Sequence, residues 1–65
     1  MMALSSREII RKMTQDGWVE VARKGSHKHF RHPIKRGRVT VPHPVKDMPL
    51  GTERSIERQS GLKLR

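Results

Sequence analysis

Residues 25–30 hold the side chains best suited to chemistry, with the sequence Gly-Ser-His-Lys-His-Phe in a strongly basic chain. Lys24 and Gly25 predict a turn, so His27 would stand where that turn enters a strand. An imidazole has an ordinary pKa of about 6.5 and can give or take a proton near neutral pH. His27 is therefore the first candidate for a general acid or base.

The charge of the chain indicates a polyanionic partner. Fifteen Lys and Arg residues against six Asp and Glu residues give a formal net charge of +9. Solubility alone needs a net charge of only about 2–8 in a small domain. Nucleic acid is the commonest polyanion that such a chain meets. An anionic membrane or an acidic protein would also fit this charge, which does not distinguish RNA from DNA.

Length and composition predict one small domain over residues 1–65. A chain of this size buries roughly 60% of the surface that its unfolded form exposes, so a deep substrate cavity is not expected. The chain has no cysteine, which excludes disulfides and thiolate metal sites. No apolar run approaches the roughly 20 residues that span a bilayer, and a signal-peptide core is lacking. We therefore expect a cytoplasmic protein with no membrane partner and no cofactor.

A helix is predicted over residues 6–16. Ser5 and Glu8 form an S-x-x-E capping box at its start, and Gly17 is a typical helix stop. Apolar residues recur at helical spacing: Ile9, Ile10 and Met13.

Three strands are predicted next, over residues 18–23, 27–32 and 38–41. Gly25 marks the first turn between them, and Pro33 with Gly37 brackets the second. Pro42 and Pro44 end the third strand, because proline cannot donate to a ladder of hydrogen bonds. The simplest product is an antiparallel meander.

A second helix is predicted over residues 50–60, with Asp47 as its cap and Gly61 at its end. Its acidic residues are expected to lie on a solvent-exposed face: Glu53 and Glu57. Residues 63–65 are expected to fray.

Together these elements predict an α+β fold of order α-β-β-β-α, with both helices on one face of a three-stranded antiparallel sheet. The other face stays open and carries cations and histidines, which suits the phosphates and 2′-hydroxyls of RNA. The order resembles the double-stranded-RNA-binding fold, although a fold alone does not give a function.

The sequence also resembles the HicA-type toxins, the small mRNA-cleaving members of HicAB toxin–antitoxin pairs, over about residues 5–62. Five segments carry the resemblance in order: Arg7-Glu8-Ile9-Ile10-Arg11-Lys12, Asp16-Gly17-Trp18, Gly25-Ser26-His27 with Phe30-Arg31-His32-Pro33, Val39-Thr40-Val41-Pro42-His43-Pro44, and Pro49-Leu50-Gly51-Thr52 with Gly61-Leu62.

The resemblance implies the toxin of a type II pair: an endoribonuclease that cuts mRNA without the ribosome, inhibits translation and growth, and is covered by a HicB-type antitoxin. The family's catalytic histidine falls on His27. Many members have a second histidine directly after the first, where this chain has Lys28. A mechanism that uses two adjacent histidines is therefore not expected here.

Residue chemistry agrees with a ribonuclease that needs no metal. A histidine that removes the proton of the RNA 2′-hydroxyl, or protonates the leaving oxygen, contributes a factor of about 10²–10⁴. Cations and backbone N–H groups must then stabilise the charged phosphorane. The candidate RNA-binding residues around His27 are Lys24, Gly25, Ser26, Lys28, His29 and Arg31. An acidic antitoxin is expected to cover the same cations.

The other histidines and the aromatic residues have simpler interpretations. His29 either binds RNA or is a plain surface residue, while His32 and His43, both beside prolines, are expected to stabilise turns. Alternation along the strand puts His32 on the opposite face from His27, which argues against a zinc site. The two aromatic residues are expected in the core: Trp18 and Phe30.

Two other classes of function fit the same residues. A non-catalytic RNA-binding module would bind RNA equally well without His27. An interaction protein would use its basic face for an acidic protein and would show no salt-sensitive affinity for RNA.

Overall fold

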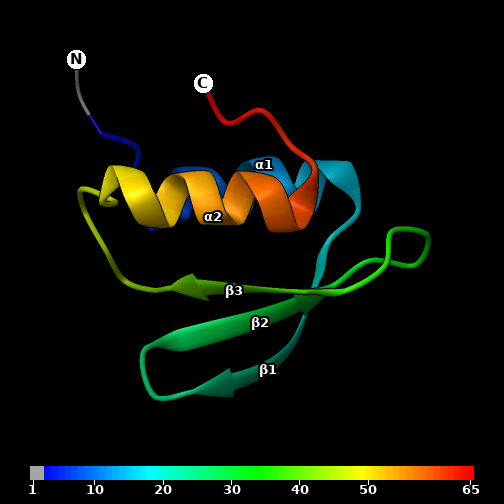
Figure 1. The fold of residues 1–65 in the computed structure, drawn as a ribbon. Coiled ribbons are helices and arrows are strands. Elements are labelled where there is room, and N and C mark those ends of the chain that lie inside the picture. The colour runs from blue at the N-terminus through cyan, green and yellow to red at the C-terminus, as the bar shows by residue number, and fades with distance from the viewer. Residues whose placement is uncertain (1–2) are drawn as a thin grey trace.

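The computed structural model describes residues 3–65 and has the predicted order α-β-β-β-α. Figure 1 shows both helices on one side of a three-stranded sheet, whose other side is open. The fold class is therefore confirmed. The elements are α1 (Ser6–Asp16), β1 (Val19–Lys24), β2 (His27–Arg31), β3 (Arg38–Pro42) and α2 (Leu50–Ser60). Both helices have the predicted bounds, and the strands differ from the predicted ones by a residue at one or both ends.

The sheet is an antiparallel meander in the order β1-β2-β3. Phe30 pairs with Val39, and both side chains are buried toward the helices. Because side chains alternate along a strand, the next residues on β2 and β3 face the open side. The ladder between β1 and β2 shifts its register between Glu20 and Ala22. All residues of β1, which is an edge strand, are exposed.

Helix α1 begins and ends as its sequence predicts. The Ser5 side chain accepts a hydrogen bond from the Glu8 backbone, and the Glu8 side chain accepts one from the Ser5 backbone. Gly17 ends the helix with a φ of 108°, a left-handed conformation that favours glycine. A Cβ atom at Gly17 would lie only 2.8 Å from Nε2 of His32, so the close approach of that ring also requires glycine here.

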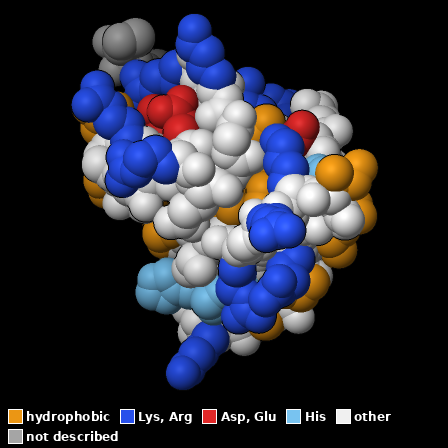
Figure 2. All heavy atoms as spheres, turned by 45° about the vertical axis from the view of Figure 1, so that its right-hand side comes forward, with side chains coloured by type: hydrophobic (Ala, Val, Ile, Leu, Met, Phe, Trp, Pro, Cys, Tyr) orange, Lys and Arg blue, Asp and Glu red, His pale blue; other side chains and the backbone are white. Residues whose placement is uncertain are grey.

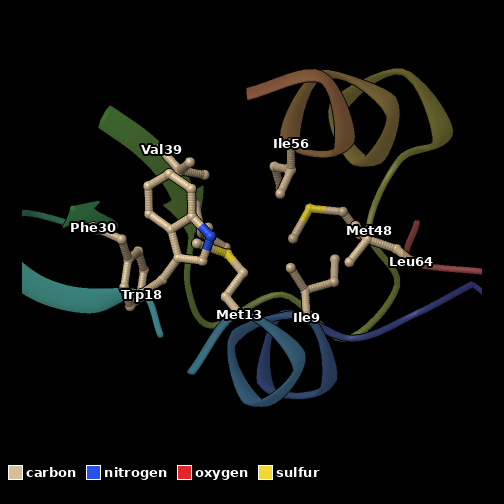
Figure 3. Packing of buried hydrophobic residues seen from close by; sticks show 9 residues of the cluster. Ile9, Met13, Trp18, Phe30, Val39, Met48, Ile56 and Leu64 are labelled. Carbon is tan, nitrogen blue, oxygen red and sulfur yellow. The ribbon is translucent and has the colours of Figure 1, made fainter. Parts of the chain in front are cut away.

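The core lies between the helices and the sheet. Figure 3 shows Trp18 and Phe30 beside Val39, and Met48 between the two helices. Trp18 and Phe30 are thus confirmed as core residues. The buried hydrophobic residues of the described chain are Ile9, Met13, Trp18, Phe30, Val39, Val41, Met48, Ile56 and Leu64.

Three predictions around α2 are wrong. Asp47 does not cap the helix: Pro49 occupies the cap position, and no side chain bonds there. Glu53 is not solvated but 1% exposed, and its Oε2 accepts a hydrogen bond of 2.8 Å from Nε of Arg65. Residues 63–65 are not frayed, because the chain turns back from the end of α2 (Figure 1) and buries Leu64 in the core. The tertiary approach of this C-terminal segment explains both the burial and the pairing.

Candidate functional site

His27 opens β2 directly after a two-residue turn. Gly25 takes a φ of 59° in that turn, and Ser26 has no positive φ, which is the pattern of a type II′ turn with glycine first. The turn places His27 opposite Lys24 on β1 and opposite Pro42 on β3. The His27 side chain is exposed and makes no hydrogen bond or ion pair within residues 3–65. Its ring nitrogens are therefore available to a ligand.

A shallow hollow of about 410 Å³ surrounds this histidine, lined by Lys24, His27, His29 and Thr40. Nδ1 of His29 lies 3.1 Å from the hydroxyl oxygen of Thr40, so the neighbouring strand orients the second imidazole. Figure 2 shows histidine side chains at the sheet end of the molecule beside a group of Lys and Arg side chains. A proton-transfer group, a cation and a hydroxyl thus share one concave surface.

The predicted RNA-binding residues divide between the two faces of the sheet. Lys24 and His29 join His27 around the hollow, and Arg31 lies two residues further along the same face of β2. Lys28 pairs with buried Val41 and therefore points to the helix side. There its Nζ lies 3.2 Å from Oε1 of Glu20.

The backbone of the turn is tied to the rest of the fold. Ser26 accepts a hydrogen bond of 2.7 Å from the backbone N–H of His43. Nδ1 of His43 lies 2.7 Å from Oγ of Ser6, and that oxygen accepts a bond of 2.9 Å from the N–H of Val45. Ser6 is buried at the start of α1. His43 thus stabilises its turn, as predicted, and also links the turn beside His27 to α1.

Sequence reasoning missed Ser6 and Thr40. A serine in the first turn of a helix resembles a capping residue, and a threonine in a strand resembles an ordinary β-former. Only the pairing of β2 with β3 brings Thr40 to His29. No signal in the sequence predicted either contact.

We expect His43 to make the stability of the protein depend on pH. Burial, followed by the nearby charges of Lys28, Arg23 and Arg7, holds the pKa of His43 below its usual value, although Glu20 acts in the opposite direction. The unfolded chain then binds more protons than the folded chain below about pH 6.5, so acidification destabilises the fold. The full stability is present above that pH and is lost as the pH falls toward the folded-state pKa.

Urea unfolding at neutral pH and at mildly acidic pH measures this effect. His43→Gln keeps a hydrogen-bonding side chain but does not titrate, so the variant should lose less stability on acidification than the unmodified protein. Equal losses in the two proteins would show that His43 is not the titrating group.

His32 stabilises the loop after β2, as predicted. Its Nε2–H donates a hydrogen bond of 2.7 Å to the carbonyl of Asp16, and its Nδ1 accepts bonds of 3.0 Å from the N–H groups of Ile34 and Lys35. These three bonds fix the orientation of the ring. The ring also packs edge-on against Trp18, with centroids 5.2 Å apart. Both ring nitrogens of His32 are thus occupied by bonds around this loop, and the residue does not line the hollow.

Within residues 3–65, no three His, Asp or Glu side chains converge into a group that could hold a metal ion. Neither of the two helices in this part of the chain is long and apolar enough to cross a membrane.

Comparison with known proteins identifies the family of the chain. A search of curated proteins found no match. The sequence model of one family, described as the HicA toxin of bacterial toxin–antitoxin systems, matches residues 6–62. This match includes both helices, the whole sheet and the turn that carries His27. The chain therefore belongs to the HicA toxin family.

Proposed function

We propose that this chain is the toxin of a type II toxin–antitoxin pair and that it cleaves mRNA without a metal ion and without the ribosome. The observation that carries the proposal is the exposed, unpaired imidazole of His27 in a hollow on the basic open face of the sheet. Membership of the HicA toxin family supports the toxin role of the chain.

In this mechanism His27 removes the proton of a 2′-hydroxyl, and the resulting oxyanion attacks the adjacent phosphorus. The bond from phosphorus to the 5′-oxygen breaks, and that oxygen takes up a proton from the imidazolium or from water. Lys24 lines the hollow and can stabilise the charge that develops on the phosphorane. The products are a 2′,3′-cyclic phosphate and a free 5′-hydroxyl. One histidine without a fixed acid partner predicts a slow enzyme.

We expect purified protein to degrade single-stranded RNA in the presence of EDTA. His27 supplies the proton transfer, and the chain contains no pattern of carboxylates that would hold Mg²⁺. The measurement is gel analysis of a labelled RNA with chemical identification of its new ends. Cleavage that requires added Mg²⁺, or that leaves 5′-phosphate ends, would contradict the mechanism.

The partner that silences this site is proposed to be an acidic HicB-type antitoxin that excludes RNA from the open face. Opposite charge speeds such an association and makes it sensitive to salt. We expect Arg31→Glu to weaken binding of RNA and antitoxin together, measured by titration calorimetry. Arg54→Glu, the same charge reversal at an exposed residue of α2 on the helix side, is the control and should weaken neither interaction. Unchanged antitoxin affinity in the Arg31 variant, with lost RNA affinity, would mean that the antitoxin acts elsewhere.

A further inference from the structure

Two arginines lie directly opposite each other on the open face of the sheet. Arg31 of β2 pairs with Arg38 of β3 at one end of the ladder. Their neighbours Phe30 and Val39 are buried against the helices, so alternation turns both arginine side chains to the face that carries His27. Both arginines are exposed.

This pairing is unfavourable in the protein by itself, because like charges directly opposite each other in an antiparallel sheet repel. Within residues 3–65 neither guanidinium forms a hydrogen bond or an ion pair. The ion pairs among the same residues join Glu20 to Lys28, Asp16 to Lys35, and Glu53 to Arg65, and neither arginine takes part in one.

We propose that Arg31 and Arg38 form a phosphate-binding subsite for the RNA chain, apart from the phosphate that is cleaved. An anion between the two guanidinium groups would remove their repulsion, and each planar group can donate two parallel hydrogen bonds to phosphate oxygens. The proposal rests on the proposed ribonuclease function and adds Arg38, which the candidate residues around His27 did not include.

The position of the subsite determines how it acts on a substrate. Arg31 lies four residues beyond His27, which is roughly 13 Å along a strand. A dinucleotide at His27 cannot reach that far, whereas a longer RNA laid along β2 can. The subsite therefore positions RNA from one side of the cleaved bond, and cleavage should improve when the RNA is extended in that direction alone.

The first experiment measures binding of a single-stranded oligonucleotide to the His27→Ala protein, with and without Arg38→Gln. Loss of a charged hydrogen bond should weaken binding about tenfold. The slope of log affinity against log salt should fall by about 0.7, the value for one phosphate contact on a single strand. Arg54→Gln on α2, exposed on the helix side, is the matched control and should change neither quantity.

The second experiment uses substrate length. In the otherwise unmodified protein, Arg38→Gln should reduce the preference in kcat/KM for long RNA over a dinucleotide, while Arg54→Gln should keep it. If the protein cleaves RNA but the two variants keep the same preference, the subsite is wrong and the ribonuclease function stands.

The third experiment does not depend on RNA cleavage. Inorganic phosphate should raise the melting temperature of the unmodified protein more than that of Arg38→Gln. Without phosphate, the Arg38→Gln protein should melt at the same temperature as the unmodified protein or higher, because the substitution removes a repulsion between two arginines. If Arg38 had only a structural role, the substitution would lower the melting temperature. A lower melting temperature, or an equal response to phosphate, would overturn the subsite. The subsite would also be overturned if Arg38→Gln lost affinity for polyglutamate but kept its affinity for RNA. That result would assign Arg31 and Arg38 to binding of an acidic protein.

Discussion

Replacing His27 with alanine should reduce RNA cleavage by about 10²–10⁴ while the fold stays intact, because the imidazole supplies the proton transfer. Its exposed side chain contacts nothing in the core, so the melting temperature should change little. The two measurements are the rate of cleavage of a labelled RNA and a thermal melt. Growth arrest after induction of the gene should disappear in parallel.

His29→Ala is the matched control for this variant. The residue lines the same hollow but is held by Thr40, so we expect weaker activity without complete loss. A His27 variant that still cleaves RNA would remove the catalytic assignment. If neither the parent nor the His27 variant cleaves RNA, and both bind it equally well, the result would favour the non-catalytic RNA-binding module.

Leu64→Ala should leave much of the protein unfolded at ambient temperature. Leu64 is 2% exposed and packs in the core, and truncation of a buried leucine costs about 2–5 kcal/mol. A domain of this size has a total stability on the order of 3–5 kcal/mol. Circular dichroism in urea would measure the loss.

Leu50→Ala tests whether burial is the cause. It is the same substitution at a residue that is 50% exposed, so its effect should stay within about 0.5 kcal/mol. Equal losses in the two variants would contradict the docking of the C-terminal segment onto the core.

The local elements could be predicted from the sequence because their signals are local. The capping box at Ser5 and Glu8 and the left-handed glycine at Gly17 bound α1, and both are present. Val39 and Val41 alternate with polar Thr40, which is the local pattern of a strand with one buried face, and both valines are buried. The turn before His27 was predicted in the same way, from Gly25 and its neighbours.

Contacts between distant residues could not be predicted. Glu53 resembles a solvated helix residue until Arg65 is known to approach it, twelve positions later. Arg38 resembles any strand cation until the register of β3 sets it opposite Arg31. Such pairings depend on the relative placement and register of elements that are distant in the sequence. Neither the periodicity nor the composition of the sequence determines that placement.

The bond from His43 to Ser26 also bears on how much order the site must gain when RNA arrives. A free hairpin tip would sample many conformations, and fixing each backbone residue costs about 1–2 kcal/mol of conformational entropy. Here the turn is already fastened through His43 to the buried hydroxyl of Ser6, so much of that entropy is lost during folding. Substrate therefore meets a preorganised backbone next to His27, and more of its binding free energy remains for orienting the bond that breaks.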